Sequence, residues 1–154
     1  MRRYILLFAL LVPFVVNAQI PAIAALGKEA SKQKGVEYDS VGSVMLGMAQ
    51  TFANKEQRET FKMLSNIEII ECKNLDYAPQ LTQRVMTIVR SVGATFIGRK
   101  DDGKAINELY GVKRGDVITE LIIIVKSHKG EVGVVVMSGE IPTNRLAEIE
   151  KIKR

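Results

Sequence analysis

The residue types that most often carry catalysis or bind metals are scarce in this chain. Its 154 residues include one histidine, His128, and one cysteine, Cys72. His128 lies in a segment that predicts a hairpin turn, and no partner histidine or cysteine stands at ligand spacing from it. A catalytic base needs a nucleophile and an orienting acid beside it, and zinc sites need several His or Cys ligands. The sequence therefore predicts no catalytic residue, no cofactor site and no metal site.

Acidic pairs are the remaining route to acid–base chemistry. Glu68 and Glu71 are close in sequence, but the two-residue period of a strand places them on opposite faces. Glu148 and Glu150 fall among lysines, as on a solvated helix face. Asp101-Asp102-Gly103 lacks the alternating acids of a calcium loop and indicates a turn. A hydrolase whose dispersed acidic residues converge only after folding stays open as an alternative.

The sulfur-containing residues allow two interpretations each. Met45 and Met48 have the spacing of a copper-binding thioether pair, but with Val41 and Phe52 they also form an apolar helical stripe, and we favour core packing. Cys72 follows a run of isoleucines, which indicates a small buried hydrophobic residue. A reactive or dimer-bridging thiol is the alternative for Cys72.

The first 18 residues have the pattern of a removable export signal. Arg2 and Arg3 precede an apolar run, Tyr4–Val16, and small residues of Val16-Asn17-Ala18 stand before Gln19. The run is shorter than the roughly 20 residues of a membrane-spanning helix. A lipoprotein signal needs a cysteine at the cleavage site, which this chain lacks. We expect cleavage before Gln19, no transmembrane span in the mature chain, and a periplasmic or secreted protein.

The composition is that of an ordinary globular protein, with 47% hydrophobic and 25% charged residues. Loss of the two signal arginines lowers the net charge from +5 to +3. Charges of both signs are interspersed, which argues against a nucleic-acid-binding surface. We expect residues 1–18 as signal peptide, residues 19–35 as a flexible leader or short helix, and residues 36–154 as one domain.

The spacing of apolar residues predicts the elements of this domain. A strand at Val36–Asp39, a helical region from Val41 to Ser65 and a strand at Ile67–Cys72 come first. A helix follows, with Asp76 as its N-cap and Gly93 after its last residue.

Four strands separated by turns come next, which predicts an antiparallel meander. They cover Ala94–Arg99, Ala105–Val112, Val117–Lys126 and Glu131–Ile141. Pro142 then opens a last helix with Leu146, Ile149 and Ile152 facing inward. The order β-α-β-α-β-β-β-β-α predicts an α+β fold, a mainly antiparallel sheet with helices on one face. A ferredoxin-like variant is one form of this class.

Several segments together resemble a family of small exported bacterial proteins of unknown function. They are Phe96–Gly103, Val117–Val125 with Thr119-Glu120-Leu121 at its centre, and Val134–Ile141, a strand ending in Ser-Gly-x-Ile before the final helix. The likeness runs from about Val36 to Ile152. It implies a Gram-negative envelope location, commonly beside genes for extracytoplasmic signalling factors, and no assigned activity.

The leading hypothesis is therefore an exported, non-enzymatic module that binds a protein or small ligand in the envelope, with a link to envelope signalling or stress. One alternative is the hydrolase with a dispersed acidic site. Another is an oligomerising structural protein that pairs through a sheet edge, because the β-rich half has apolar strands.

Overall fold

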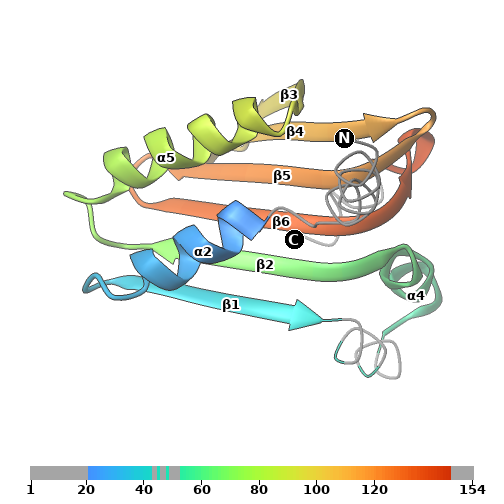
Figure 1. Cartoon of the computed structure of the whole chain (residues 1–154), viewed down its shortest axis with the longest axis horizontal. Coiled ribbons are helices and arrows are strands. Elements are labelled where there is room, and N and C mark those ends of the chain that lie inside the picture. Colours follow the sequence, from blue (N-terminus) through green and yellow to red (C-terminus); the bar gives the residue numbers. More distant parts are fainter. Residues whose placement is uncertain (1–20, 43–44, 46–47, 49–52, 147–154) are drawn as a thin grey trace, which may run out of the picture.

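The computed structural model describes residues 21–42, 45, 48 and 53–146. Its centre is a six-stranded antiparallel sheet with the order β1-β2-β6-β5-β4-β3 (Figure 1). The α+β class that the sequence predicts is confirmed. The strands are β1 (Val36–Gly42), β2 (Leu64–Cys72), β3 (Thr95–Asp101), β4 (Ala105–Arg114), β5 (Val117–Ser127) and β6 (Val132–Pro142).

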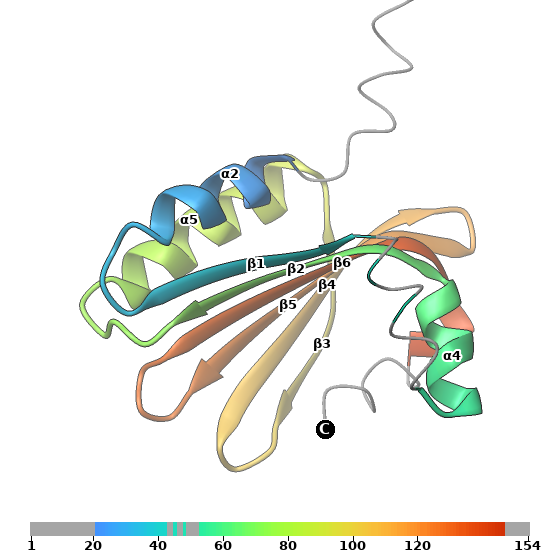
Figure 2. The same ribbon diagram turned by 90° about the horizontal axis from the view of Figure 1, so that it is seen from below.

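Three helices are described, α2 (Pro21–Ala30), α4 (Lys55–Lys62) and α5 (Ala78–Ser91), and a 3₁₀ turn, η1 (Thr143–Arg145), follows β6. Helices α2 and α5 lie side by side on one face of the sheet, here called the helix-covered face (Figure 2). Helix α4 lies at one end of the sheet on the other side. The expectation that helices pack on one face thus holds for α2 and α5.

Strands β3 to β6 form the predicted meander, in which each strand pairs with the next. Strand β6 then pairs with β2, and β2 with β1, both antiparallel. A ferredoxin-like fold is built from split β-α-β units, in which another strand separates the two. Because β1 and β2 are direct neighbours here, the ferredoxin-like variant is not the arrangement found.

Helix α5 follows the predicted pattern, with one correction at its start. Leu81, Val85 and Val89 are buried on one side, and Gly93 ends the helix with φ 69°. The N-cap residue is Tyr77 rather than Asp76, and its side chain makes no capping bond. Instead, Asn74 Oδ1 accepts from the backbone nitrogens of residues 76 and 77, both at 3.1 Å. The amide side chain satisfies the free N–H groups and leaves Asp76 exposed.

Of the two expectations for residues 19–35, a flexible leader or a short helix, residues 21–30 meet the second, because they form α2, and they contribute to the core. Ile23 and Ala30 are 0% exposed and Leu26 is 3% exposed. Gly27, which weakens the helical pattern in the sequence, packs against the ring of Tyr38 in β1, where a Cβ would lie 2.7 Å from Cε2. The residue that looks like a helix breaker is the one that lets α2 approach the sheet.

The sheet carries a buried apolar cluster on each face. The cluster on the helix-covered face joins α2 and α5 to the sheet through Ile70, Ile122, Ile124, Val134 and Val136, among others. The cluster on the opposite face contains Leu109, Ile118, Leu121, Ile123, Met137 and Ile141. Both faces of β5 are therefore buried, as its uninterrupted apolar run predicts.

Some expected elements lie only partly within the described residues. Val41 belongs to β1 rather than to a helix, and Asn54 caps α4 through a reciprocal bond with Gln57. Of the predicted last helix, Leu146 packs against the cluster on the opposite face. Ile149 and Ile152 lie outside the described residues.

Candidate functional site

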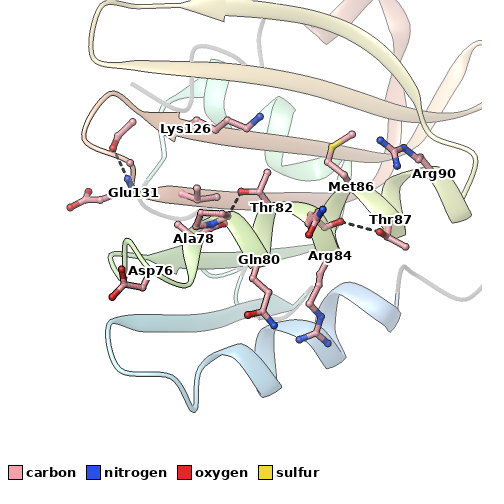
Figure 3. Close-up of a pocket in the computed structure, with 15 residues that line it drawn as sticks. Asp76, Ala78, Gln80, Thr82, Arg84, Met86, Thr87, Arg90, Lys126 and Glu131 are labelled. Carbon is pink, nitrogen blue, oxygen red and sulfur yellow. Dashed lines mark hydrogen bonds between the residues drawn. The ribbon is translucent and has the colours of Figure 1, made fainter.

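An open groove runs along α5 on the helix-covered face, between this helix and the hairpin that joins β5 to β6 (Figure 3). Its volume is about 1010 Å³. Uncharged polar side chains line much of it, among them Gln80, Gln83 and Thr87. The lining residues that the structure describes include no histidine and no cysteine.

Cations of the groove are held by acids from neighbouring elements. Arg84 points toward α2 (Figure 3), where its guanidinium donates to both oxygens of Glu29 at 3.1 and 2.8 Å. Lys126 Nζ lies 3.0 Å from Glu108 Oε1. Arg90 adds a cation at one end of the groove, and Glu131 adds an acid at the other. The groove therefore carries charges of both signs. A partner surface that also has charges of both signs would fit it better than a polyanion would.

Beneath this groove, Tyr110 and Glu108 support Lys126 on the same face. Tyr110 Oη donates to Glu108 Oε2 at 2.7 Å. Burial would raise the pKa of Glu108, but hydrogen bonds from Tyr110 and Lys126 outweigh it, and the pKa is lowered. Burial and the neighbouring Glu108 raise the pKa of Tyr110 to about 12. Glu108 therefore stays ionised and fixes the ammonium group that faces the groove.

A second polar cluster on the helix-covered face brings together Glu68 of β2 and Glu120 of β5, here called the carboxyl pair. Glu68 lies opposite Val136 and Glu120 opposite Ser138, so the two flank β6 at neighbouring positions of one face. Ser138 Oγ donates to Glu120 Oε2 at 2.6 Å. Neither glutamate lines the groove along α5.

Burial opposes ionisation of both members of the pair. It raises the pKa of Glu120, and the charge of Glu68 raises it further against the hydrogen bond from Ser138. Burial likewise raises the pKa of Glu68 against hydrogen bonds from Tyr38 and Asn66. Raised carboxyl pKa values close together are one mark of functional sites, although buried structural networks produce them too.

The sequence did not predict this pair, because Glu68 and Glu120 are 52 residues apart and meet only through strand register. The pair that the sequence does suggest, Glu68 and Glu71, does not converge: Glu68 shares a face with Ile70, whereas Glu71 is exposed. Glu148 and Glu150 lie outside the described residues. Within residues 21–42 and 53–146, no three His, Cys, Asp or Glu side chains cluster as a metal site would require.

His128 lies in the β5–β6 turn, as expected, and its Nε2 is 3.2 Å from Asp101 Oδ1. Asp101 also accepts from the backbone nitrogen of Gly103, whose φ is 86°, so Asp101-Asp102-Gly103 is the predicted turn. The hydrogen bond from Gly103 and then the one from His128 lower the pKa of Asp101. The pair ties two hairpin turns together at an exposed position.

Of the predictions for the sulfur-containing residues, the one for Cys72 is confirmed and the one for Met45 and Met48 is wrong. Cys72 is buried, and burial raises the pKa of its thiol, as for a small core residue. Met45 and Met48 are 58% and 64% exposed, so core packing of these two side chains is wrong. Helical spacing alone does not show whether such a pair of side chains is buried.

The comparison with known protein families matches residues 30–149 to the family described as Domain of unknown function (DUF4252). The chain belongs to this family. The match spans α5, all six strands and the carboxyl pair, and it begins at the last residue of α2. The resemblance to a family of unknown function is thus confirmed. No curated protein and no solved structure matches the chain.

The described residues also bear on the expectation of no transmembrane span, since their helices are those of α2, α4 and α5. None of these helices is long and apolar enough to cross a bilayer.

Proposed function

We propose that this DUF4252 protein is exported and works in the cell envelope as a non-enzymatic binding module, which takes a protein or small polar ligand in the groove along α5. The observation that carries the proposal is the groove itself, an open surface groove of about 1010 Å³ along the packed helix α5. A binding groove on a rigid helix loses little conformational entropy when a ligand binds, because its side chains and backbone are already ordered.

The lining of the groove favours binding over catalysis. The hydroxyls of Thr82 and Thr87 donate to carbonyls of their own helix, at 2.9 and 3.0 Å. The backbone nitrogen of Glu131 donates to Ser127 Oγ. A nucleophilic hydroxyl requires an adjacent base that takes its proton, whereas the two threonine hydroxyls donate their protons to helix carbonyls.

Export is supported by the N-terminal sequence and is compatible with the position of α2. The proposed cleavage site after Ala18 precedes Ile23, which is fully buried in the core. Removal of residues 1–18 would therefore leave every described core contact in place. Cell fractionation followed by N-terminal sequencing tests this: we expect Gln19 as the first residue of an extracytoplasmic protein, and an uncleaved cytoplasmic chain would contradict it.

The binding proposal is tested by comparing two matched variants. Gln83 lies exposed in the groove, and Gln33 lies exposed outside it. Tagged wild-type protein and the variants Gln83→Arg and Gln33→Arg are incubated with envelope extract of the source cells. We expect a component retained by wild type and Gln33→Arg and lost from Gln83→Arg. Equal retention by both variants would refute binding in the groove.

A hydrolase with an acidic site is a second candidate, and the carboxyl pair is the observation that favours it. Folding places the two glutamates on either side of β6, where the charge of Glu68 acts on Glu120, but neither lines the groove. A hydrolase screen of wild type against Glu68→Gln and Glu120→Gln separates the two functions. Turnover that is lost in either variant would establish the enzyme and displace the binding module.

A further inference from the structure

Two of the cations that line the groove along α5 are neutralised within the protein. Arg84 is held by Glu29 at 2.8 Å, and Lys126 by Glu108 at 3.0 Å. Neither acid lines the groove, so each closes its ion pair from a neighbouring element. The net charge that the groove offers to a ligand must therefore come from its other ionisable residues.

The other ionisable residues of the lining lie at opposite ends of the groove (Figure 3). Asp76 and Glu131 lie at the end where α5 begins, and Arg90 lies at the end where it finishes. In the part of the chain that the structure describes, none of these three side chains forms a hydrogen bond or an ion pair. The groove is therefore polarised, with two carboxylates at one end and a guanidinium at the other.

The dipole of α5 accounts for only part of this pattern. A helix carries about half a positive charge at its N-terminus and half a negative charge at its C-terminus, so Asp76 and Arg90 also stabilise α5. Glu131, however, belongs to the connection before β6 and not to this helix. Two full negative charges at one end and one positive charge at the other exceed the partial charges of the dipole, so both ends remain charged.

The distance between the two ends selects the size of the ligand. Arg90 follows Ala78 by 12 residues, which corresponds to about 18 Å along the helix. A small metabolite is too short to contact both ends, whereas about six residues of extended polypeptide span this length. Between the ends, Gln83 offers an exposed amide and Met86 an adaptable apolar surface.

We propose that the groove binds a charge-polarised polypeptide segment of a partner protein, with basic side chains facing Asp76 and Glu131 and acidic side chains facing Arg90. This inference rests on the proposed function, because it takes the groove as the binding site. It narrows the ligand from a protein or small molecule to a segment of a protein.

Two synthetic peptides of about eight residues, with blocked termini and the same composition, are the probes. In the polarised peptide, lysines stand at one end and glutamates at the other; in the second peptide, lysines and glutamates alternate. Binding to the wild-type protein is measured by fluorescence anisotropy. We expect the polarised peptide to bind about threefold to tenfold more tightly, and its advantage to shrink as salt is added. Equal affinities, or no binding of the polarised peptide, would overturn the proposal.

Charge reversal at each end shows whether the groove is responsible. In Arg90→Glu and in Glu131→Lys, we expect the advantage of the polarised peptide to fall below about twofold. Lys113→Glu and Glu140→Lys make the same changes of charge at exposed positions outside the groove and should keep the wild-type advantage. An advantage that survives in both end variants would overturn the proposal.

The component retained from envelope extract separates this proposal from the proposed function. A component that is lost from Gln83→Arg but kept by both Arg90→Glu and Glu131→Lys would establish the groove as a binding site and refute the polarised segment. A component that still binds after the extract is digested with protease would do the same. Equal retention by Gln83→Arg and Gln33→Arg would refute binding in the groove itself.

Discussion

At the scale of single residues, Glu120 is a side chain whose ionisation opposes the fold. It lies in the most apolar strand, and burial and Glu68 raise its pKa. A raised pKa in the folded state means stability that is present below the unfolded pKa and is lost as pH rises through the folded value. We expect Glu120→Gln to raise the free energy of unfolding at pH 7, by up to about 1 kcal/mol because solvent screens part of the charge.

Urea unfolding at two pH values checks this effect. Near pH 4, where glutamate is largely protonated in both states, wild type and Glu120→Gln should have the same unfolding free energy. A stabilisation that is equal at both pH values would show that packing, and not charge, distinguishes the two side chains.

Gly27 is a second residue at which a substitution should change stability. Gly27→Ala should destabilise the protein by about 1–3 kcal/mol, because the new methyl group would overlap the Tyr38 ring. The higher helix propensity of Ala, about 1 kcal/mol, offsets only part of this. Gly98→Ala is the control, since nothing lies within 4 Å of a Cβ there. Thermal unfolding that ranks Gly98→Ala below Gly27→Ala would contradict the packing of α2 on Tyr38.

Residues whose roles depend on local sequence were predictable, and residues whose roles depend on register were not. The turn at Asp101-Asp102-Gly103 and the glycine after α5 follow from backbone chemistry within a few residues. Glu68 and Glu120 are brought to neighbouring positions of one face only because β2 and β5 both pair with β6. No local pattern specifies that contact.

At the scale of elements, α2 is an integral part of the core. Ile23 is fully buried, whereas Ala25 on the same helix is exposed. We expect Ile23→Ala to lower the free energy of unfolding by about 2–5 kcal/mol, from lost burial and the cavity left behind. Ala25→Ser should change it by no more than about 0.5 kcal/mol. Equal free energies of unfolding for the two variants in a denaturant titration would show that α2 does not contribute to the stability of the fold.

The difference between α2 and α5 shows why one helix was predictable and the other was not. Helix α5 has an apolar residue at each helical repeat, and its buried residues fall where that period places them. Helix α2 begins with Pro21 and contains Gly27, two residues that usually mark loops. The reason for Gly27 lies in β1, so the sequence of α2 alone cannot supply it.

At the scale of the whole molecule, each sheet edge carries features that disfavour pairing with the same edge of another copy. The edge strand β1 carries Glu37 and Asp39. The other edge, β3, carries Arg99 and Lys100 and has an irregular register between Phe96 and Gly98. Charges and bulges on edges disfavour edge-to-edge association. We expect light scattering to give the mass of one chain, and a concentration-independent dimer would revive the edge-pairing alternative.

The sequence of the strands in the chain was predictable from their turns, but their order in the sheet was not. The meander of β3 to β6 follows from short connections between neighbours. The pairing of β6 with β2 joins segments about 70 residues apart and rests on matched apolar faces. That pairing also creates the helix-covered face on which both the groove and the carboxyl pair lie.

Photo-crosslinking in living cells shows whether the groove along α5 binds a component of the cell envelope. A photoreactive amino acid is placed at Gln83 in the groove or at Lys113, an exposed residue near the β4–β5 turn. We predict a discrete crosslinked product from the Gln83 position and none from the Lys113 position. No product from the groove, or the same product from both positions, would contradict the claim.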